Sequence, residues 1–204
     1  MLTYKRAVNN LTKIAKQASQ ENWTQGKAWY PAARAFCLVL SNRTGLSVDQ
    51  IVGILAALSP QCSWEENKRA TEELVLSGTI GVTVCYPANV KKAKRILQGE
   101  DPALVLGGFK VRAFFNNILY PNTSQDVTVD THAARAAFNQ ILFTRSEQNF
   151  IFRRKGNEII QRAYKTVANA YKVTPCTLQA VIWLTVKDVI GTLPRGEQNA
   201  VYNK

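Results

Sequence analysis

The sequence has few of the residues that build metal centres or covalent cross-links. Its 204 residues include one histidine, His132, and four cysteines that lie far apart and form no Cys-x-x-Cys pair. A structural zinc or iron–sulfur site needs a cluster of thiolate or imidazole ligands, so we expect no metal and no other cofactor. Scattered cysteines in apolar or helical surroundings behave as small core residues, which favours a reducing compartment.

Long hydrophobic runs are also missing. No apolar stretch approaches the roughly 20 residues of a membrane span. The first residues, Met1–Arg6, are basic but lack the apolar core of a signal peptide. We therefore expect no membrane association and a cytoplasmic location. The hydrophobic content of 46% is still enough to bury one core, or two small lobes that share a groove.

Acidic residues are scarce. The chain has 14 Asp and Glu against 26 Lys and Arg, which gives a formal net charge of +12. The positive charges are spread from Lys5 to Lys187, so they indicate a basic face on a folded body rather than a basic tail. Such a face suits a polyanion, because neutralised phosphates release counterions. The charge favours a nucleic-acid partner over a role in solubility alone.

Nearly every segment has the 3.6-residue periodicity of an amphipathic helix, which predicts an all-α fold. We expect helices over Tyr4–Ser19, Trp29–Thr44, Val48–Leu58, Trp64–Leu76, Pro87–Leu97, Phe109–Leu119, Asp130–Phe143, Asn157–Tyr171 and Pro175–Ile190. The segment Gly78–Val84 is expected to be irregular, Arg153–Lys155 to lie in a loop, and Thr192–Lys204 to be frayed. No internal repeat and no long linker divides the chain.

The segment Val129-Asp130-Thr131-His132 carries the clearest chemical signal. Asp130 follows a short β-like run and precedes an alanine-rich apolar stripe, so it occupies an expected helix start. An aspartate there is first of all an N-cap that accepts N–H groups of the next turn. A carboxylate held in this way stays ionised, and it can stabilise a sugar cation or activate a water molecule. The two roles are compatible.

Two motifs resemble the helix-hairpin-helix DNA glycosylases, the endonuclease III superfamily. The V-D-T-H segment resembles the one that holds the family's catalytic aspartate, and Leu106–Arg112 lies at the distance of the hairpin L-P-G-V-G-R-K, matching at Leu106 and Gly108. The segment Leu55–Trp64 resembles the family's L-L-S-A-Q-A-T-D, whose glutamine fills the gap left by a flipped base. That resemblance implies a wedge role for Gln61.

The chain is more closely similar to uncharacterised bacteriophage proteins, which would place it in the cytoplasm of a host cell. The residues that carry this likeness are Trp29-Tyr30, Ser59-Pro60, Trp64, Lys110-Val111 and Val129-Asp130.

The resemblance implies a two-lobed helical protein. One lobe would span about residues 46–143, and the other would combine the N-terminal helices with about residues 144–191. The implied partner is DNA, a duplex with one flipped base, bound by a monomer. Gly107, Gly108, Lys110 and Arg112 would hold the DNA backbone. Asp130 would stabilise positive charge on the deoxyribose or activate water.

Departures from the family pattern bear on the chemistry. Arg112 stands where the family has its Schiff-base lysine, and a guanidinium stays protonated and cannot act as the amine nucleophile. Hydrolysis without strand cleavage is therefore expected, unless Lys110 takes the catalytic role. Lys110 also replaces the second hairpin glycine, and an alternative alignment leaves the hairpin deleted. His132 is expected to support Asp130 as a hydrogen-bonding scaffold.

Aromatic and amide side chains are candidates for a base pocket. Tyr30 and Trp64 could stack on an extruded base, and Gln179 could read its edge, although aromatics at helical spacing are more often core residues. Three functions follow. The first is excision of a modified or damaged base. The second is modification of hypermodified thymine with displacement of pyrophosphate, as proposed for phage proteins of similar fold. The third is DNA binding without catalysis.

Overall fold

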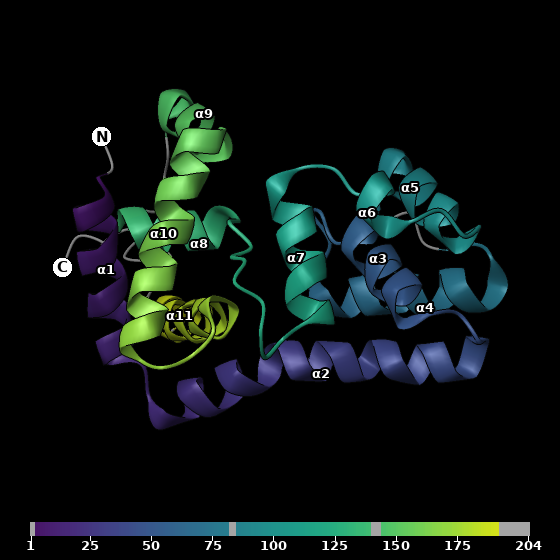
Figure 1. The fold of residues 1–204 in the computed structure, drawn as a ribbon, viewed down its shortest axis with the longest axis horizontal. Helices are drawn as coiled ribbons and strands as arrows, with labels where there is room; N and C mark the ends of the chain where they lie inside the picture. The colour runs from purple at the N-terminus through teal and green to yellow at the C-terminus, as the bar shows by residue number, and fades with distance from the viewer. Residues whose placement is uncertain (1–2, 82–84, 140–143, 192–204) are drawn as a thin grey trace. The chain divides into compact units, whose positions relative to one another are not determined.

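The computed structural model describes residues 3–81, 85–139 and 144–191. Every regular element in these ranges is an α-helix, which confirms the all-α class (Figure 1). The helices are α1 (Tyr4–Gln17), α2 (Gln20–Thr44), α3 (Val48–Leu58), α4 (Trp64–Ser77), α5 (Pro87–Leu97), α6 (Pro102–Val105), α7 (Phe109–Leu119), α8 (Thr131–Phe138), α9 (Arg145–Phe152), α10 (Arg154–Ala170) and α11 (Pro175–Gly191). In these same ranges no helix is both long and apolar enough to cross a membrane.

Most of the expected helices are found, with three differences. Helix α2 begins at Gln20 rather than at Trp29, α6 and α9 were not expected, and Arg154 and Lys155 belong to α10 rather than to a loop. Helix α8 ends at Phe138, where Asn139 takes a left-handed conformation with φ 56°. Residues 140–143 of the expected helix, residues 82–84 of the irregular segment and the expected frayed end lie outside the described residues.

The early start of α2 has a local cause. The Ser19 backbone N–H donates to Asn22 Oδ1 at 3.0 Å, and the Asn22 N–H donates to Ser19 Oγ at 3.1 Å. This reciprocal pair supplies partners for N–H groups that a helix start otherwise leaves unpaired. Gly26, which lowers helix propensity, is needed for packing, because a Cβ there would lie 2.4 Å from Val181 Cγ2 of α11.

The chain divides into two compact units, each with its own core. Unit 1 comprises Met1–Tyr30 and Asn122–Lys204, and unit 2 comprises Pro31–Pro121. One boundary therefore falls inside α2, and the other falls just after α7. This division differs from the expected lobes, because α8 and Asp130 belong with the terminal helices. The cause is the alanine-rich face of α8, which packs against α1, α10 and α11.

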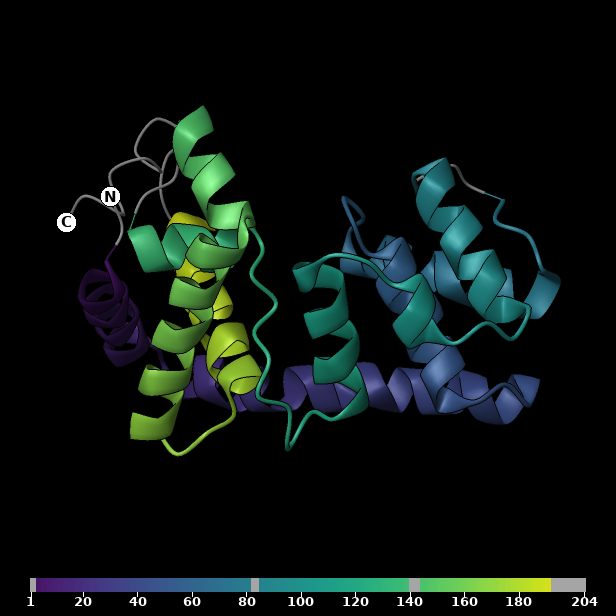
Figure 2. The same ribbon diagram turned by 45° about the horizontal axis from the view of Figure 1, so that its top comes forward.

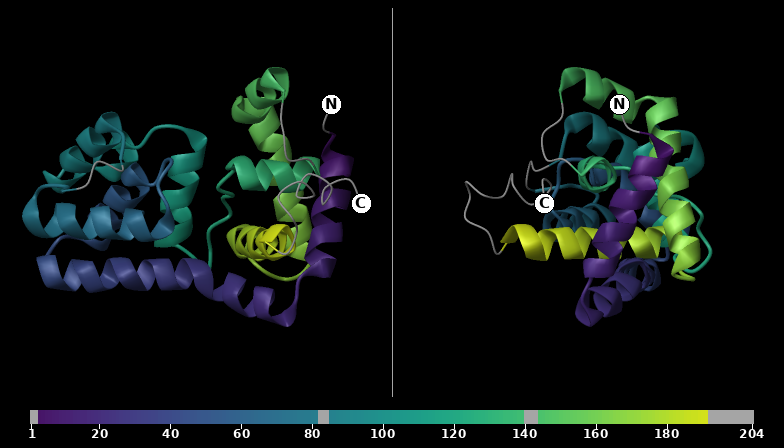
Figure 3. Two further views of the ribbon diagram at one scale, coloured as in Figure 1. Left: turned by 180° about the vertical axis from the view of Figure 1, so that it is seen from behind. Right: turned by 90° about the vertical axis from the view of Figure 1, so that its left-hand side faces the viewer.

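The core of unit 1 is built around α10. Helices α1, α8, α9 and α11 pack against it (Figure 3). Tyr164, near the middle of α10, is fully buried. Helix α1 contributes an apolar face made of Ala7, Leu11, Ile14 and Ala15. Helices α9 and α10 approach closely at Gly156, where a Cβ would lie 2.1 Å from the Phe150 carbonyl oxygen.

The core of unit 2 is built around α3. Its residues 51–58 are all buried, and α4, α5, α6 and α7 pack against it (Figure 2). The second half of α2 belongs to the same unit. There, Arg34 Nε donates to the Leu119 carbonyl oxygen at 3.1 Å, and Arg43 pairs with Glu72 at 2.7 Å.

Candidate functional site

The Leu106–Arg112 motif lies in a tight connection between two helices. Helix α6 ends at Val105, and Leu106, Gly107 and Gly108 form the turn into α7; we call Pro102–Leu119 the α6–α7 hairpin. Gly108 has φ 78°, a left-handed conformation that favours glycine. Both glycines are exposed and have open space around the position of a Cβ. A tight turn between two helices therefore lies where the hairpin is expected, and its correspondence to the family's hairpin stays a prediction.

The start of α7 combines backbone donors with positive charge. No side chain caps this helix start, so the N–H groups of its first turn point outward without a capping acceptor. Lys110 is half-buried in that first turn, and Arg112 is exposed one residue beyond Val111. Arg112 Nε donates to the Leu106 carbonyl oxygen at 2.8 Å, which braces the turn. Such a helix start attracts anions, because the helix dipole and the N–H groups act together.

Gln61 occupies an exposed turn between α3 and α4 of unit 2. Its φ of 59° is left-handed, which costs a non-glycine residue about 1–2 kcal/mol. The Tyr86 hydroxyl donates a hydrogen bond to Gln61 Oε1. Tyr86 is itself 51% exposed, so the pair lies at the surface. A strained, exposed amide held by a second side chain is a feature typical of contact sites.

The two aromatic residues expected in a base pocket fall in different units. Trp64 begins α4 in unit 2, where it packs edge-on against Phe36 with ring centroids 6.5 Å apart. Lys68 Nζ lies 5.6 Å from the centroid of the Trp64 ring. Tyr30 is buried in unit 1, and its hydroxyl donates to Thr128 Oγ1 at 3.4 Å. Neither unit alone brings these rings together.

Asp130 is the N-cap of α8, as expected. Its Oδ1 accepts the Ala133 backbone N–H at 2.7 Å, and the side chain is half-buried. Among the described residues, no donor is hydrogen-bonded to the second oxygen, Oδ2, which leaves that oxygen available to a ligand. His132 is exposed in the first turn of α8, and the expected scaffold hydrogen bond is not found among the described residues.

Gln179 of α11 positions the segment that leads to Asp130. Its Oε1 accepts the Thr128 backbone N–H at 2.9 Å, and its Nε2 donates to the Thr128 carbonyl oxygen at 2.6 Å. Both residues are buried, with 8% of Gln179 and 4% of Thr128 exposed. The side chain therefore acts as a clamp on the backbone two residues before Asp130. The sequence signal for this role was a lone amide inside the apolar face of a helix.

Cys37, Cys85 and Cys176 are buried thiols, and Cys62 is half-buried. Burial raises the pKa of both Cys37 and Cys62 to about 12, and it also raises the pKa of Cys85 and Cys176. A protonated thiol is a poor nucleophile and a poor metal ligand. Over the described ranges, no group of three or more His, Cys, Asp or Glu side chains is arranged to hold a metal ion.

The two units differ in charge. Unit 1 contains 16 Lys and Arg against 7 Asp and Glu, whereas unit 2 contains 10 against 7. Most of the excess positive charge is therefore carried by the unit that contains Asp130.

Comparison with known proteins identifies one family. A family model described as "Family of unknown function (DUF7178)" matches residues 1–189. No curated protein and no solved structure matches the chain.

Proposed function

The chain belongs to the DUF7178 family of unknown function, and we propose that it is a DNA-binding enzyme that hydrolyses the N-glycosidic bond of a flipped, modified or damaged base. The observation that carries this proposal is Asp130, a capping carboxylate with one oxygen available, held in place by the Gln179 clamp on a basic unit. The resemblance of its segment to that of the helix-hairpin-helix DNA glycosylases supports the same chemistry.

In the proposal, the α6–α7 hairpin binds the DNA backbone. The first-turn N–H groups of α7 donate hydrogen bonds to a phosphate oxygen, and Lys110 and Arg112 add positive charge beside it. Glycine at positions 107 and 108 lets the backbone approach the phosphate without side-chain obstruction. Lys110 stands at the position of the family's second glycine. There its positive charge attracts the phosphate in place of a close approach of the backbone.

Gln61 enters the duplex in place of the extruded base. Gln61 lies in an exposed turn with a left-handed backbone, and the Tyr86 hydroxyl orients its amide by a hydrogen bond to Oε1. Extrusion of a base costs a few kcal/mol of stacking and pairing, which an inserted side chain partly offsets.

The chemical step is hydrolysis at C1′ of the deoxyribose. A water oxygen forms a bond to C1′, and the C1′–N bond breaks with its electron pair remaining on the base nitrogen. Asp130 stabilises the positive charge that develops on the sugar, or accepts the proton of the attacking water. That proton ends on the departing base. Arg112 forms no Schiff base, so the product keeps an intact strand.

A panel of labelled duplexes tests this proposal. It contains normal, deaminated, alkylated and hypermodified bases, and it includes 5-hydroxymethyluracil activated with pyrophosphate. Asp130→Asn keeps an oxygen that can cap α8 but removes the charge, so base release should fall by about 10²–10⁴-fold while the fold is retained. Asp49→Asn is the control, because Asp49 is an exposed acid in the first turn of α3.

The same panel separates the other two functions. Release of pyrophosphate without release of a base would assign a base-modifying enzyme. Salt-sensitive binding without either product, equal in the wild type and Asp130→Asn, would assign a DNA-binding protein without catalysis.

A further inference from the structure

Helix α1 presents a basic flank beside its buried face. It contains Lys5, Arg6, Lys13 and Lys16 and no acidic residue. At 100° per residue, Lys5 and Lys16 lie within about 20° of each other around the helix axis, about 100–120° from Tyr4 and away from the buried face, and both are exposed. The opposite flank contains Asn10, which donates to the Ala137 carbonyl oxygen of α8.

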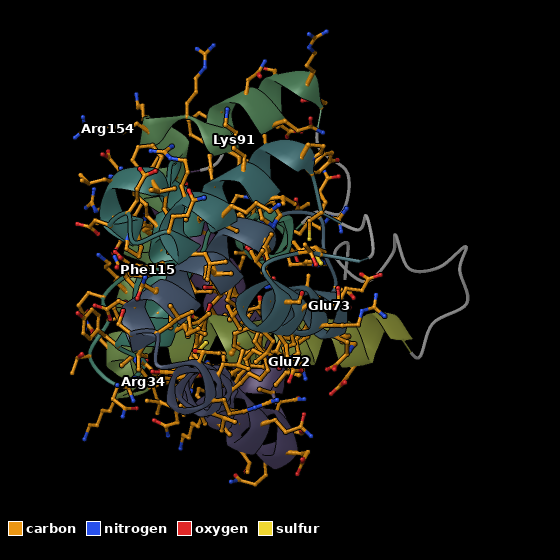
Figure 4. The ribbon with its side chains drawn as sticks, turned by 90° about the vertical axis from the view of Figure 1, so that its right-hand side faces the viewer. Arg34, Glu72, Glu73, Lys91, Phe115 and Arg154 are labelled. Atoms are coloured by element: carbon orange, nitrogen blue, oxygen red, sulfur yellow. The ribbon has the colours of Figure 1, made fainter. Side chains whose placement is uncertain are left out.

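Helix α10 continues this basic flank. Lys155 and Arg162 are exposed and lie two turns apart on one face of the helix. The single acid of α10, Glu158, is paired with Arg154 Nε at 2.8 Å, and Arg154 is 83% exposed at the helix start (Figure 4). No unpaired carboxylate of α10 therefore offsets the charges of Lys155 and Arg162.

Two contacts join the helices into one surface. Helix α1 packs along α10 (Figure 3). The hydroxyl oxygen of Tyr4 lies 2.6 Å from Thr166 Oγ1. The Arg162 guanidinium lies 5.1 Å from the centroid of the Tyr4 ring. Stacking on an aromatic ring restricts the planar guanidinium and leaves its edge available for an oxyanion. We call Lys5, Lys16, Lys155 and Arg162 the α1–α10 surface.

We propose that the α1–α10 surface binds the sugar–phosphate backbone of nucleic acid. The proposal extends the proposed function, on which it rests, by assigning a second backbone contact to unit 1. Lys5 and Lys16 are about 17 Å apart along the helix axis. That length corresponds to roughly five nucleotides of a strand that rises 3.4 Å per residue. The surface thus offers several cations at a spacing that phosphates of one strand segment can match.

A lipid surface is the other polyanion that basic amphipathic helices bind. Helices of that kind insert their apolar face into the headgroup region. The apolar face of α1, made of Ala7, Leu11, Ile14 and Ala15, is buried in the core of unit 1 and is not available for insertion. The structure therefore favours nucleic acid over a membrane.

Salt-dependent binding of a 30-base-pair duplex tests the proposal with two matched triple variants. The test variant is Lys5→Gln, Lys16→Gln and Lys155→Gln, and the control is Lys27→Gln, Lys91→Gln and Lys94→Gln. All six lysines are exposed, so both variants should fold, which circular dichroism and thermal unfolding verify. Both lose three positive charges, so any difference between them reports position rather than net charge. Lys91, for example, projects from α5 (Figure 4).

The slope of log K against log salt should become less negative by about 2–3 in the test variant and by less than about 1 in the control. Each phosphate contact contributes about −0.9 to this slope. Equal slopes in the two variants would overturn the proposal. So would a test variant that binds DNA normally but no longer binds vesicles containing phosphatidylserine. Binding needs no base release, so a position-dependent slope with an inactive panel would refute the proposed function and leave this surface intact.

Discussion

The clamp formed by Gln179 gives the sharpest stability prediction. Gln179→Met keeps a side chain of similar length but removes both hydrogen bonds to the Thr128 backbone, at 2.9 Å and 2.6 Å. Both residues are buried, so the variant loses two buried hydrogen bonds, while the Thr128 carbonyl oxygen still accepts the Asp130 backbone N–H. Each hydrogen bond contributes about 0.5–1.5 kcal/mol net, which predicts a loss of about 1–3 kcal/mol in the free energy of unfolding.

Urea unfolding followed by circular dichroism measures this loss. The control is Gln125→Ala, because the exposed Gln125 also donates to a backbone carbonyl oxygen, that of Thr123 at 3.4 Å. Water can replace its hydrogen bond, so the control should change stability by less than about 0.5 kcal/mol. A loss below about 1 kcal/mol in Gln179→Met would refute the reasoning that the clamp holds this segment.

The clamp also links stability to the proposed chemistry. Thr128 lies two residues before Asp130, and the Asp130 backbone N–H donates to the Thr128 carbonyl oxygen at 2.8 Å. Release of Thr128 therefore shifts the carboxylate. Gln179→Met should lower kcat for base release with little change in DNA affinity. Weakened DNA binding with kcat unchanged would contradict a positioning role.

Three further predictions concern the fold and its titration. Asp130→Ala should destabilise the protein by about 1 kcal/mol in urea unfolding through loss of the α8 cap, whereas Asp130→Asn should cost less than half of that. Gly156→Ala should cost about 1–3 kcal/mol because its Cβ would meet the Phe150 carbonyl oxygen, and Gly107→Ala, in open space, should lower thermal stability far less. Burial raises the pKa of Cys37 to about 12, so the contribution of the buried thiol to the free energy of unfolding is complete below pH 9. That contribution falls by about 1.4 kcal/mol per pH unit between pH 9 and 12. Urea unfolding over about pH 8.5–10.5 should therefore show a smaller loss of stability with rising pH in Cys37→Ala than in the wild type.

Helices with a clear apolar period and a visible cap were predictable from sequence. Helix α3 shows both, because Ser47 and Gln50 form a capping box and the stripe that follows is apolar. Helix α9 begins with a similar box, Thr144 with Glu147, but its short polar run hid the signal. The first turns of α2 were missed for a related reason, since Gly26 and its polar neighbours suggest a loop until the contact with Val181 is known.

The grouping of the helices into two units could not be predicted from local sequence patterns. The alanine stripe of α8 predicts a buried face, but it does not specify the partners of that face. Its packing on α1, α10 and α11 depends on residues far apart in the sequence. This packing places Asp130 in unit 1 rather than in the lobe expected over residues 46–143. The role of Gln179 was hidden for the same reason, because its partner Thr128 lies 51 residues away.

The measurement that tests the central claim most directly is base release from the duplex panel by the wild type and Asp130→Asn. The proposed function predicts that the wild type releases at least one modified or damaged base and leaves the strand intact. It also predicts that Asp130→Asn binds the same duplex with equal affinity and releases the base about 10²–10⁴-fold more slowly. Equal release by both proteins would contradict the role of Asp130, and no release from any duplex by the wild type would contradict the assignment of a base-excising enzyme.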